Sequence, residues 1–291
     1  MIRPNDKNTG GLLGGFAQRV TSRRRVPDDY EWSLDLFAGG GGWSLGYEAA
    51  TGWAVDHACN HDPLAIACHQ VNHPATEHHQ QSVWDADPRE LEPDRVLGYL
   101  HLSPDCTHHS KARGGRPVSD RVRGLAWVAL PWMCFRRPRV VTLENVEEYR
   151  DWGPLDEHGK PIKARKGETF RAWLACMTTG LDADHPAWEE IEAVIPSVPR
   201  EALERGLGYD VDYRELRACD YGAPTIRKRF FFVGRCDGKP IRWPEATHGP
   251  ETSVKKTGGK IAPYVPAAAC IDFSLPIPSI FLTREQAKAW G

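Results

Sequence analysis

The feature that most constrains the fold of this chain is the segment SLDLFAGGGG at residues 33–42. Its first half is apolar and ends at glycine, which predicts a short buried strand over residues 33–37. Four consecutive glycines, Gly39–Gly42, carry no Cβ atom, so a ligand can approach the backbone closely. Residues 43–50 then predict a helix, whose first N–H groups point at such a ligand. This order is typical of the first unit of a nucleotide-binding type of α/β fold.

The glycine pattern alone leaves the ligand open, because it matches only half of the dinucleotide signature and no phosphate-loop lysine follows. A plain tight turn is the alternative. Further along the chain, strands are predicted at residues 54–59, 80–84, 97–103, 139–143 and 226–234, with a pair of strands at residues 208–219. Helices are predicted at residues 62–71, 124–135 and 170–177. This alternation predicts an α/β fold with a functional site at the C-terminal edge of the strands.

Composition excludes several classes of protein. The chain has no run of 18 apolar residues and no apolar signal segment, so we expect no membrane partner and a cytoplasmic location. Its eight cysteines show no pairing pattern, which favours free thiols in a reducing compartment. The formal net charge is −2, so binding to nucleic acid has to come from a local basic patch.

One such patch lies between residues 108 and 124, where five cations stand against the single acid Asp120 among flexible glycines. The five cations are Lys111, Arg113, Arg116, Arg121 and Arg123. They predict a flexible loop that closes on a polyanion, with an ordinary solvated loop as the alternative. Residues 1–30 are expected to form a flexible basic arm.

Reactive side chains follow the predicted strand ends. Cys106 comes after residues 97–103, and Glu144 comes after residues 139–143. Arg227 and Arg229 stand two residues apart, which places them on one face of the last strand. A thiolate needs nearby positive charge, which the basic loop supplies. Cys106 with His108 is an alternative thiol-hydrolase pair, for which no third orienting group is evident.

Four motifs occur in a characteristic order, namely Asp35–Gly42 (DLFAGGGG), Ser103–Cys106 (SPDC), Glu144–Val146 (ENV) and Gly222–Arg229 (GAPTIRKR). In this order the chain resembles the DNA cytosine-5 methyltransferases, in particular their phage and prophage branch. The resemblance covers about residues 33–235. It implies a Rossmann-like S-adenosylmethionine-dependent methyltransferase fold, with a mostly parallel sheet and helices on both faces. It also implies S-adenosyl-L-methionine as cofactor and double-stranded DNA as substrate.

The resemblance implies a role for each matched residue. Cys106 is the nucleophile that adds to C6 of cytosine, and Glu144 bonds N3 and the exocyclic amine. Arg229 holds O2, and Arg227 supports the catalytic site. The residues implied to contact the cofactor are Asp35, Phe37, Ala38, Gly39, Gly41, Gly42, Asn60, His61, Ser82, Val83 and Pro104. In a duplex the base must leave the stack before it reacts, which fits a mobile basic loop that contacts DNA beside the cysteine.

The chain departs from the family pattern at several positions. Asp105 stands where a proline usually precedes the cysteine, and a neighbouring anion disfavours a thiolate. Asn60 replaces an acidic ribose ligand, and His61 replaces a large apolar residue. Ser82 replaces an adenine-binding aspartate, although Asp85 is close, and Thr225 replaces a glutamine. We interpret these changes as divergence within an active family.

The predicted organisation has three parts: a basic arm at residues 1–30, a catalytic domain at residues 31–237, and an irregular C-terminal segment at residues 238–291. Family members continue into a target-recognition domain, and residues 266–276 resemble the junction into it. We therefore expect recognition to come from a missing part or from a separate recognition subunit. Two other functions stay open, a non-catalytic or split-enzyme DNA-binding subunit and an RNA cytosine-5 methyltransferase.

Potential metal ligands are dense between residues 59 and 79, at Cys59, His61, Cys68, His69, His73, His78 and His79. They do not stand in a zinc-finger arrangement, so no metal is expected. We interpret most of them as surface histidines or small core thiols.

Overall fold

The computed structural model describes residues 30–105 and 124–274. It divides into two compact units, Met1–Leu216 with Lys228–Trp243, and Arg217–Arg227 with Pro244–Gly291. The described part of the second unit consists of short elements: η5 (Ala218–Tyr221), β8 (His248–Gly249), α9 (Glu251–Lys256), β9 (Ala262–Pro263) and η6 (Ala267–Cys270).

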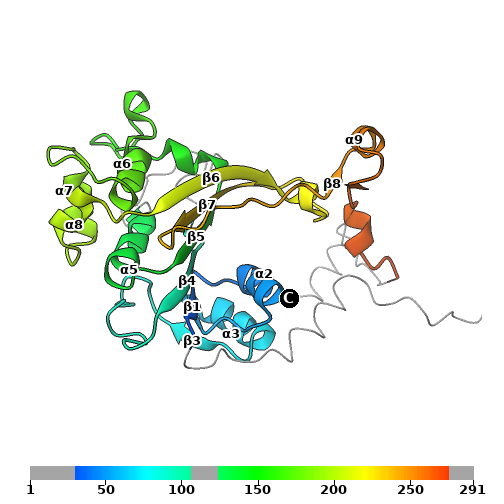
Figure 1. Ribbon diagram of the computed structural model, residues 1–291, viewed down its shortest axis with the longest axis horizontal. Helices are drawn as coiled ribbons and strands as arrows, with labels where there is room; N and C mark the ends of the chain where they lie inside the picture. The colour runs from blue at the N-terminus through cyan, green and yellow to red at the C-terminus, as the bar shows by residue number, and fades with distance from the viewer. Residues whose placement is uncertain (1–29, 106–123, 275–291) are drawn as a thin grey trace, which may run out of the picture. The chain divides into compact units, whose positions relative to one another are not determined.

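The first unit is built on a seven-stranded sheet in the order β3-β2-β1-β4-β5-β7-β6 (Figure 1). Its strands are β1 (Trp32–Leu36), β2 (His57–Asn60), β3 (Glu77–Gln80), β4 (Leu97–Leu102), β5 (Val140–Asn145), β6 (Asp210–Arg217) and β7 (Lys228–Arg235). The neighbours from β3 to β5 are parallel, and β7 runs antiparallel to β5.

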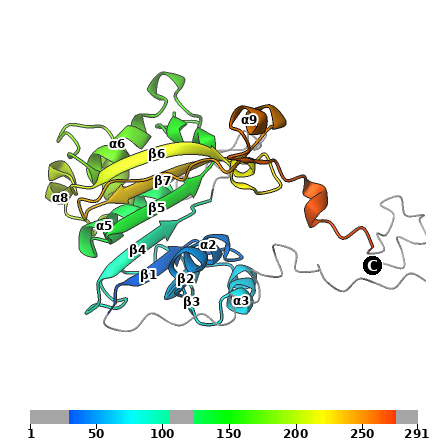
Figure 2. The same ribbon diagram turned by 45° about the vertical axis from the view of Figure 1, so that its right-hand side comes forward.

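Helices cover both faces of this sheet. They are α2 (Gly42–Thr51), α3 (Pro63–Asn72), α5 (Ala129–Phe135), α6 (Glu168–Met177), α7 (Trp188–Val194) and α8 (Arg200–Arg205), with single turns η2 (Gly124–Val128), η3 (Glu147–Asp151) and η4 (Lys163–Arg165). Figure 2 shows α2 and α3 on one side of the sheet and α5 and α6 on the other. The predicted Rossmann-like α/β fold is therefore confirmed.

Aromatic side chains fill the core between the sheet and the helices on the side of α5 and α6. Five tryptophans are at most 1% exposed, namely Trp32, Trp127, Trp132, Trp152 and Trp173. Each buried ring contributes about 1.5–3 kcal/mol from the removal of its apolar surface from water. Tyr149 lies in η3, and Trp152 directly follows this turn. The two buried rings contact each other, so the chain is packed firmly just after the end of β5 that carries Glu144.

Two predicted strands are displaced in the structure. The strand expected at residues 54–59 is β2, which begins only at His57, because Asp56 accepts hydrogen bonds from the N–H and hydroxyl of Ser33, both at 3.0 Å. The strand expected at residues 80–84 is β3, which ends at Gln80. Helices α7 and α8 were not predicted, since residues 181–205 are interrupted by prolines. Within the described ranges, none of the helices has the length and apolar character needed to span a bilayer.

Candidate active site

The glycine turn lies at the topological switch point of the sheet. From β1 the chain proceeds to β2 and β3, and it then returns to the other side of β1 as β4. Leu36 and Leu102 are in register at the ends of β1 and β4, and the Ser103 hydroxyl donates to the carbonyl of Phe37 at 3.4 Å. Ligands of open α/β sheets bind in the crevice at such a point. The topology therefore brings two of the four motifs, DLFAGGGG and SPDC, to one place.

Three carbonyl groups of the turn are held from one side by β2 and α3. The donors and acceptors are Asn60 Nδ2 to Ala38 O (3.0 Å), Asn72 Nδ2 to Gly40 O (2.9 Å) and His73 Nε2 to Gly41 O (3.1 Å). In a trans peptide the C=O and the next N–H point in opposite directions. The N–H groups of Gly39, Gly41 and Gly42 therefore point away from α3. This direction makes them available to a ligand above the turn.

The free space around the turn differs from one glycine to the next. A Cβ atom on Gly39 or Gly42 would meet nothing within 4 Å, so the backbone is open there. Gly41 has φ +91°, and a Cβ atom there would lie 2.1 Å from His73 Nε2. Gly41 is also the N-cap of α2 and offers no side-chain cap. The first turn of α2 is therefore left to an anionic group, such as the carboxylate of an amino-acid ligand.

We expect Gly41→Ala to destabilise the fold by about 2–4 kcal/mol, since the new methyl group combines a left-handed backbone with a steric clash. Urea unfolding of the two proteins measures the difference. Gly46→Ala is the matched control, because Gly46 lies inside α2 where a Cβ atom meets nothing within 4 Å. That control should be stabilising by up to about 1 kcal/mol. Equal effects of the two substitutions would contradict the assigned geometry.

A buried polar chain runs beneath the turn. The Ser44 hydroxyl donates to Asp35 Oδ2 at 2.8 Å and accepts from His69 Nε2 at 3.1 Å, and His69 Nδ1 accepts from His78 at 2.8 Å. Asp35 is 2% exposed, and its Oδ1 has no hydrogen-bond partner among the described residues. Burial raises the pKa of Asp35 to about 7. Asp35 therefore supports the turn from below and offers one oxygen to a donor in the crevice.

A second buried pair supports the same turn. His73 and Glu48 have side chains 2% exposed, and His73 Nδ1 lies 2.9 Å from Glu48 Oε1. His73 Nε2 also lies 3.1 Å from the Gly41 carbonyl, so the ring links Glu48 of α2 to the glycine turn. The interpretation of the histidines in this segment as surface residues was wrong for His69 and His73, which are 0% and 2% exposed. Polar partners from α2, the glycine turn and β3 made this burial possible.

Asp35→Asn should change how stability depends on pH. The folded protein keeps the Asp35 proton up to about pH 7, whereas the unfolded chain releases it near pH 4, so folding takes up a proton between these values. This group therefore lowers wild-type stability as pH rises from about 4 to 7, by at most about 4 kcal/mol. The advantage of the Asp35→Asn variant over wild type should grow across that window and stay level above it. Urea unfolding at several pH values measures it.

The comparison of the two proteins is needed because buried histidines act in the opposite direction. Burial lowers the pKa of His69 and of His101 to about 3. Each of these groups therefore lowers the stability of the folded protein as pH falls below the pKa of a free histidine. These two groups are present in both proteins and largely cancel in the difference. A difference that is flat between pH 4 and 7 would contradict the assignment.

The other residues predicted to contact the cofactor differ in their burial and in their hydrogen bonds. Asn60 joins the turn to α3, since its Oδ1 also accepts from Asp62 N at 2.9 Å. Phe37 has φ +67° and is half-buried, and His61 is exposed. Val83 is 8% exposed and belongs to the core, while the Ser82 hydroxyl accepts from the N–H of Trp84 at 3.3 Å. A nearby cavity of about 220 Å³ is lined by Leu36, Cys59, Gln81 and Asp85 among others, so Asp85 rather than Ser82 faces open space.

The second half of the site lies at the ends of β4 and β5. Asn145 is 2% exposed, donates to the carbonyl of Pro104 at 3.0 Å and accepts from the N–H of Val146 at 2.8 Å. It therefore fixes the position where the chain leaves β4 toward Cys106. The sequence analysis did not assign this role to Asn145, although its place in the ENV motif was the available signal.

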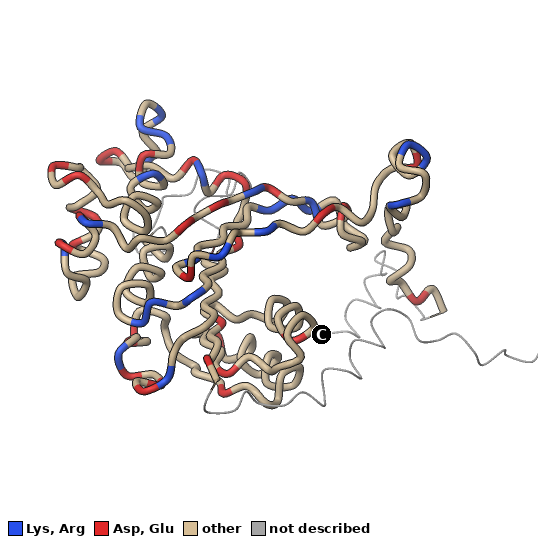
Figure 3. The backbone as a smooth tube through the Cα atoms, in the orientation of Figure 1, with Lys and Arg blue, Asp and Glu red and all other residues tan. Residues whose placement is uncertain are grey.

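Glu144 and Arg229 meet across the antiparallel pair of β5 and β7. Glu144 is in register with Phe231, so Arg229, two residues earlier, lies on the same face. Arg229 Nε is 3.1 Å from Glu144 Oε1, and the side chains are 23% and 29% exposed. Lys228 points to Glu147 and Glu215, at 2.5 and 2.8 Å. Figure 3 shows acidic and basic positions along β6, whereas the charged positions of β7 are all basic.

The prediction that Arg227 shares a strand face with Arg229 was wrong. β7 begins at Lys228, and Arg227 is an exposed residue of the second unit, where its carbonyl accepts from Ala218 N at 2.9 Å. Cys106 and the predicted DNA-binding residues Lys111, Arg113, Arg116, Arg121 and Arg123 lie outside the described residues. Asp105, just before them, is exposed, where water screens its carboxylate.

Residues 33–152 match the family model of the C-5 cytosine-specific DNA methylases. The match places residues 33–152 of this chain in that family. Its cofactor is S-adenosyl-L-methionine, and the open glycine backbone, the uncapped start of α2 and the available Asp35 oxygen fit such a ligand. The predicted family is thereby confirmed for the catalytic region.

Several Type II methyltransferases are similar to this chain. M.AquIA of Picosynechococcus sp. is 27% identical over 246 residues, 79% of this chain and 84% of that protein. M.XorII of Xanthomonas oryzae pv. oryzae is 30% identical over 224 residues, 74% of this chain and 43% of that protein. M.AgeI of Thalassovita gelatinovora is 28% identical over 221 residues, 74% of this chain and 42% of that protein. The chain thus spans less than half the length of the last two.

Proposed function

We propose that this chain transfers a methyl group from S-adenosyl-L-methionine to C5 of cytosine in double-stranded DNA. The observation that carries the proposal is the Glu144–Arg229 pair, 3.1 Å apart, at the end of β5. Asn145, the next residue, holds the backbone that leads to Cys106. An acid, a guanidinium group and the approach to a thiol therefore converge beside the glycine turn.

The chemistry needs each of these groups. Cytosine C5 is a poor nucleophile until the Cys106 thiolate adds to C6, which places negative charge on the ring. Glu144, in its protonated form, donates to N3, and Arg229 donates to O2, so both stabilise that charge where it develops. S-adenosyl-L-methionine supplies an electrophilic methyl group. After methylation, loss of the C5 proton and departure of the Cys106 sulfur restore the aromatic ring.

Substrate recognition involves further parts of the chain. In this proposal, residues 31–237 form the catalytic region, Arg227 supports the site, and the basic loop contacts DNA phosphates through Lys111, Arg113, Arg116, Arg121 and Arg123. Residues 238–291 lead toward sequence recognition, which is completed by a further part of the protein or by a separate recognition subunit. We also propose a cytoplasmic location, where free thiols persist.

A methyl-transfer assay tests the proposal. The chain is incubated with labelled S-adenosyl-L-methionine and mixed-sequence duplex DNA, with tRNA in a parallel reaction, and the products are digested to nucleosides. We expect 5-methyldeoxycytidine from the duplex. Label in 5-methylcytidine of tRNA alone would move the activity to RNA. Cofactor binding without transfer to either nucleic acid, under conditions where a candidate recognition subunit is also supplied, would favour a non-catalytic subunit.

A further inference from the structure

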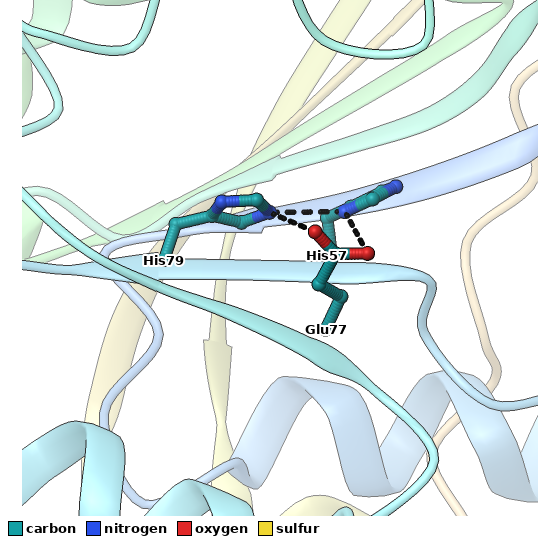
Figure 4. Close-up of side chains that lie close together, drawn as sticks. All are labelled: His57, Glu77 and His79. Carbon is teal, nitrogen blue, oxygen red and sulfur yellow. Dashed lines mark hydrogen bonds and ion pairs between the residues drawn. The ribbon is translucent and has the colours of Figure 1, made fainter.

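A cluster of nitrogen and oxygen ligands lies on the two outer strands β2 and β3, within the first unit. His57 and Glu77 are in register across this parallel pair, and His79 follows two residues later on the same face. Figure 4 shows the two imidazole rings and the carboxylate converging on one point. His78, between them, points to the opposite face toward His69. The cluster is thus separate from the polar chain beneath the glycine turn.

The distances within the cluster suit a metal ion. His57 Nδ1 lies 3.0 Å from His79 Nε2, His79 Nε2 lies 3.8 Å from Glu77 Oε1, and His57 Nδ1 lies 4.0 Å from Glu77 Oε2. Zinc bonds to imidazole nitrogen and carboxylate oxygen are about 2.0–2.2 Å, so ligand atoms at tetrahedral angles are about 3.3–3.5 Å apart. The three separations fall on both sides of this value. The two Glu77 distances involve different oxygens of the same carboxylate, so either oxygen can serve as its ligand atom.

A second carboxylate prepares His57 for this role. His57 Nε2 lies 3.3 Å from Glu92 Oε1, and Arg95 NH1 holds the same oxygen at 3.2 Å. The Nε2–H therefore donates to Glu92, which leaves the lone pair of Nδ1 directed into the cluster. A carboxylate behind a metal-bound histidine is the usual arrangement in zinc sites.

The ring of His57 is also fixed by packing. It stands edge-on to the Trp32 ring, with centroids 5.3 Å apart and an interplanar angle of 86°. By contrast, the side chains of Glu77 and His79 are 54% and 21% exposed, so the cluster opens to water on one side. One ligand is therefore rigid and buried, and the other two can adjust to an incoming ion.

We propose that His57, Glu77 and His79 form a zinc site, with Glu92 as the positioning residue behind His57 and water as the fourth ligand. The ion ties β3, the outermost strand, to β2. β2 ends at Asn60, whose side chain donates to the Ala38 carbonyl of the glycine turn. The ion therefore also stabilises the cofactor side of the sheet. The expectation that no metal binds came from the absence of finger-type spacing, and it did not include His57 or Glu77.

Zinc titration of the full chain tests the proposal. The chain is first stripped with a chelator, and ZnCl₂ is then added in competition with a chromophoric chelator. We expect one tightly bound zinc per chain. Glu77→Gln and His79→Asn should each weaken binding at least about 10-fold, and Glu92→Gln about 10- to 100-fold, the usual effect of an outer-shell carboxylate. His158→Asn, at a residue whose side chain is 73% exposed, is the matched control and should not change it.

Two further measurements separate the site from adventitious binding and from misfolding. Cobalt in place of zinc should give the visible absorption of a four-coordinate ion, and His79→Asn should remove it. Zinc should also slow amide hydrogen exchange in β3 of the wild-type chain but not in the two ligand variants. The ligand variants change exposed or half-exposed side chains, and circular dichroism verifies their folding. Absence of stoichiometric zinc in the wild type, or binding that survives both ligand variants unchanged, would overturn the proposal.

Discussion

Cys106→Ser should reduce methyl transfer to less than about one-thousandth of the wild-type rate, as expected when a covalent nucleophile is lost. A serine hydroxyl is far less acidic than a thiol and is not ionised near neutral pH, so C6 of the base gains no covalent partner. Initial rates of label transfer to mixed-sequence duplex DNA measure the effect. The same variant should still bind S-adenosyl-L-methionine, because the glycine turn is untouched.

Cys270→Ser is the matched control for this experiment. Cys270 is an exposed cysteine in the second unit and takes no part in the proposed chemistry. Its variant should transfer methyl groups at the wild-type rate. A denaturing gel adds a second readout: DNA that carries 5-fluorocytosine should be trapped on the wild-type chain, because fluorine cannot leave C5 as the proton does. Trapping on the Cys106→Ser variant, or normal activity of that variant, would end the thiol mechanism.

Glu144→Gln should lower kcat by about 100- to 1,000-fold, the usual contribution of one proton donor at a developing charge. Glutamine has nearly the shape of glutamate and still meets Arg229, so the fold should be preserved. Its amide can donate a hydrogen bond but cannot transfer a proton to N3 of the ring, however. Because the loss concerns the transition state, kcat and kcat/KM should fall together.

Glu157→Gln provides the comparison, since the Glu157 side chain is 85% exposed in the turn between Asp156 and Lys160. This change should leave both kinetic parameters as they are. If Glu144→Gln raised KM alone, Glu144 would bind the base without assisting the reaction. If it had no effect, the Glu144–Arg229 pair would be structural, and the proposed site would lose its acid.

Much of the fold was predictable because apolar runs and glycines mark it. Strands β1, β4 and β5 are buried and apolar, and α3 begins at Pro63, directly after Asp62, whose carboxylate caps the helix. β3 was misplaced because its sequence EHHQ contains no apolar residue. Its place beside β2 depends on partners that arrive from elsewhere, among them His57 and His69. A period-two search for buried side chains cannot find such a strand.

The site was predictable where its residues belong to short sequence motifs. Glu144 and Arg229 do meet, as four motifs in order implied. The supporting residues Ser44, Asn72 and His73 could not be foreseen, because histidine and asparagine are typical of surfaces until their acceptors are known. Those acceptors are backbone carbonyls and buried carboxylates brought close only by the fold. Position in the sheet, rather than residue type, decided their role.

The reversed direction of β7 has a consequence for how this catalytic region tolerates change. Because β7 is antiparallel to β5, the start of β7 lies beside the end of β5. Arg229 therefore contacts Glu144 through the strand pairing, and this contact does not depend on the chain between the two strands. The exposed turn at residues 156–160 can therefore change in length or accept an inserted reporter, while the acid and the guanidinium keep their spacing. That segment is where length variants of this enzyme should be sought and engineered first.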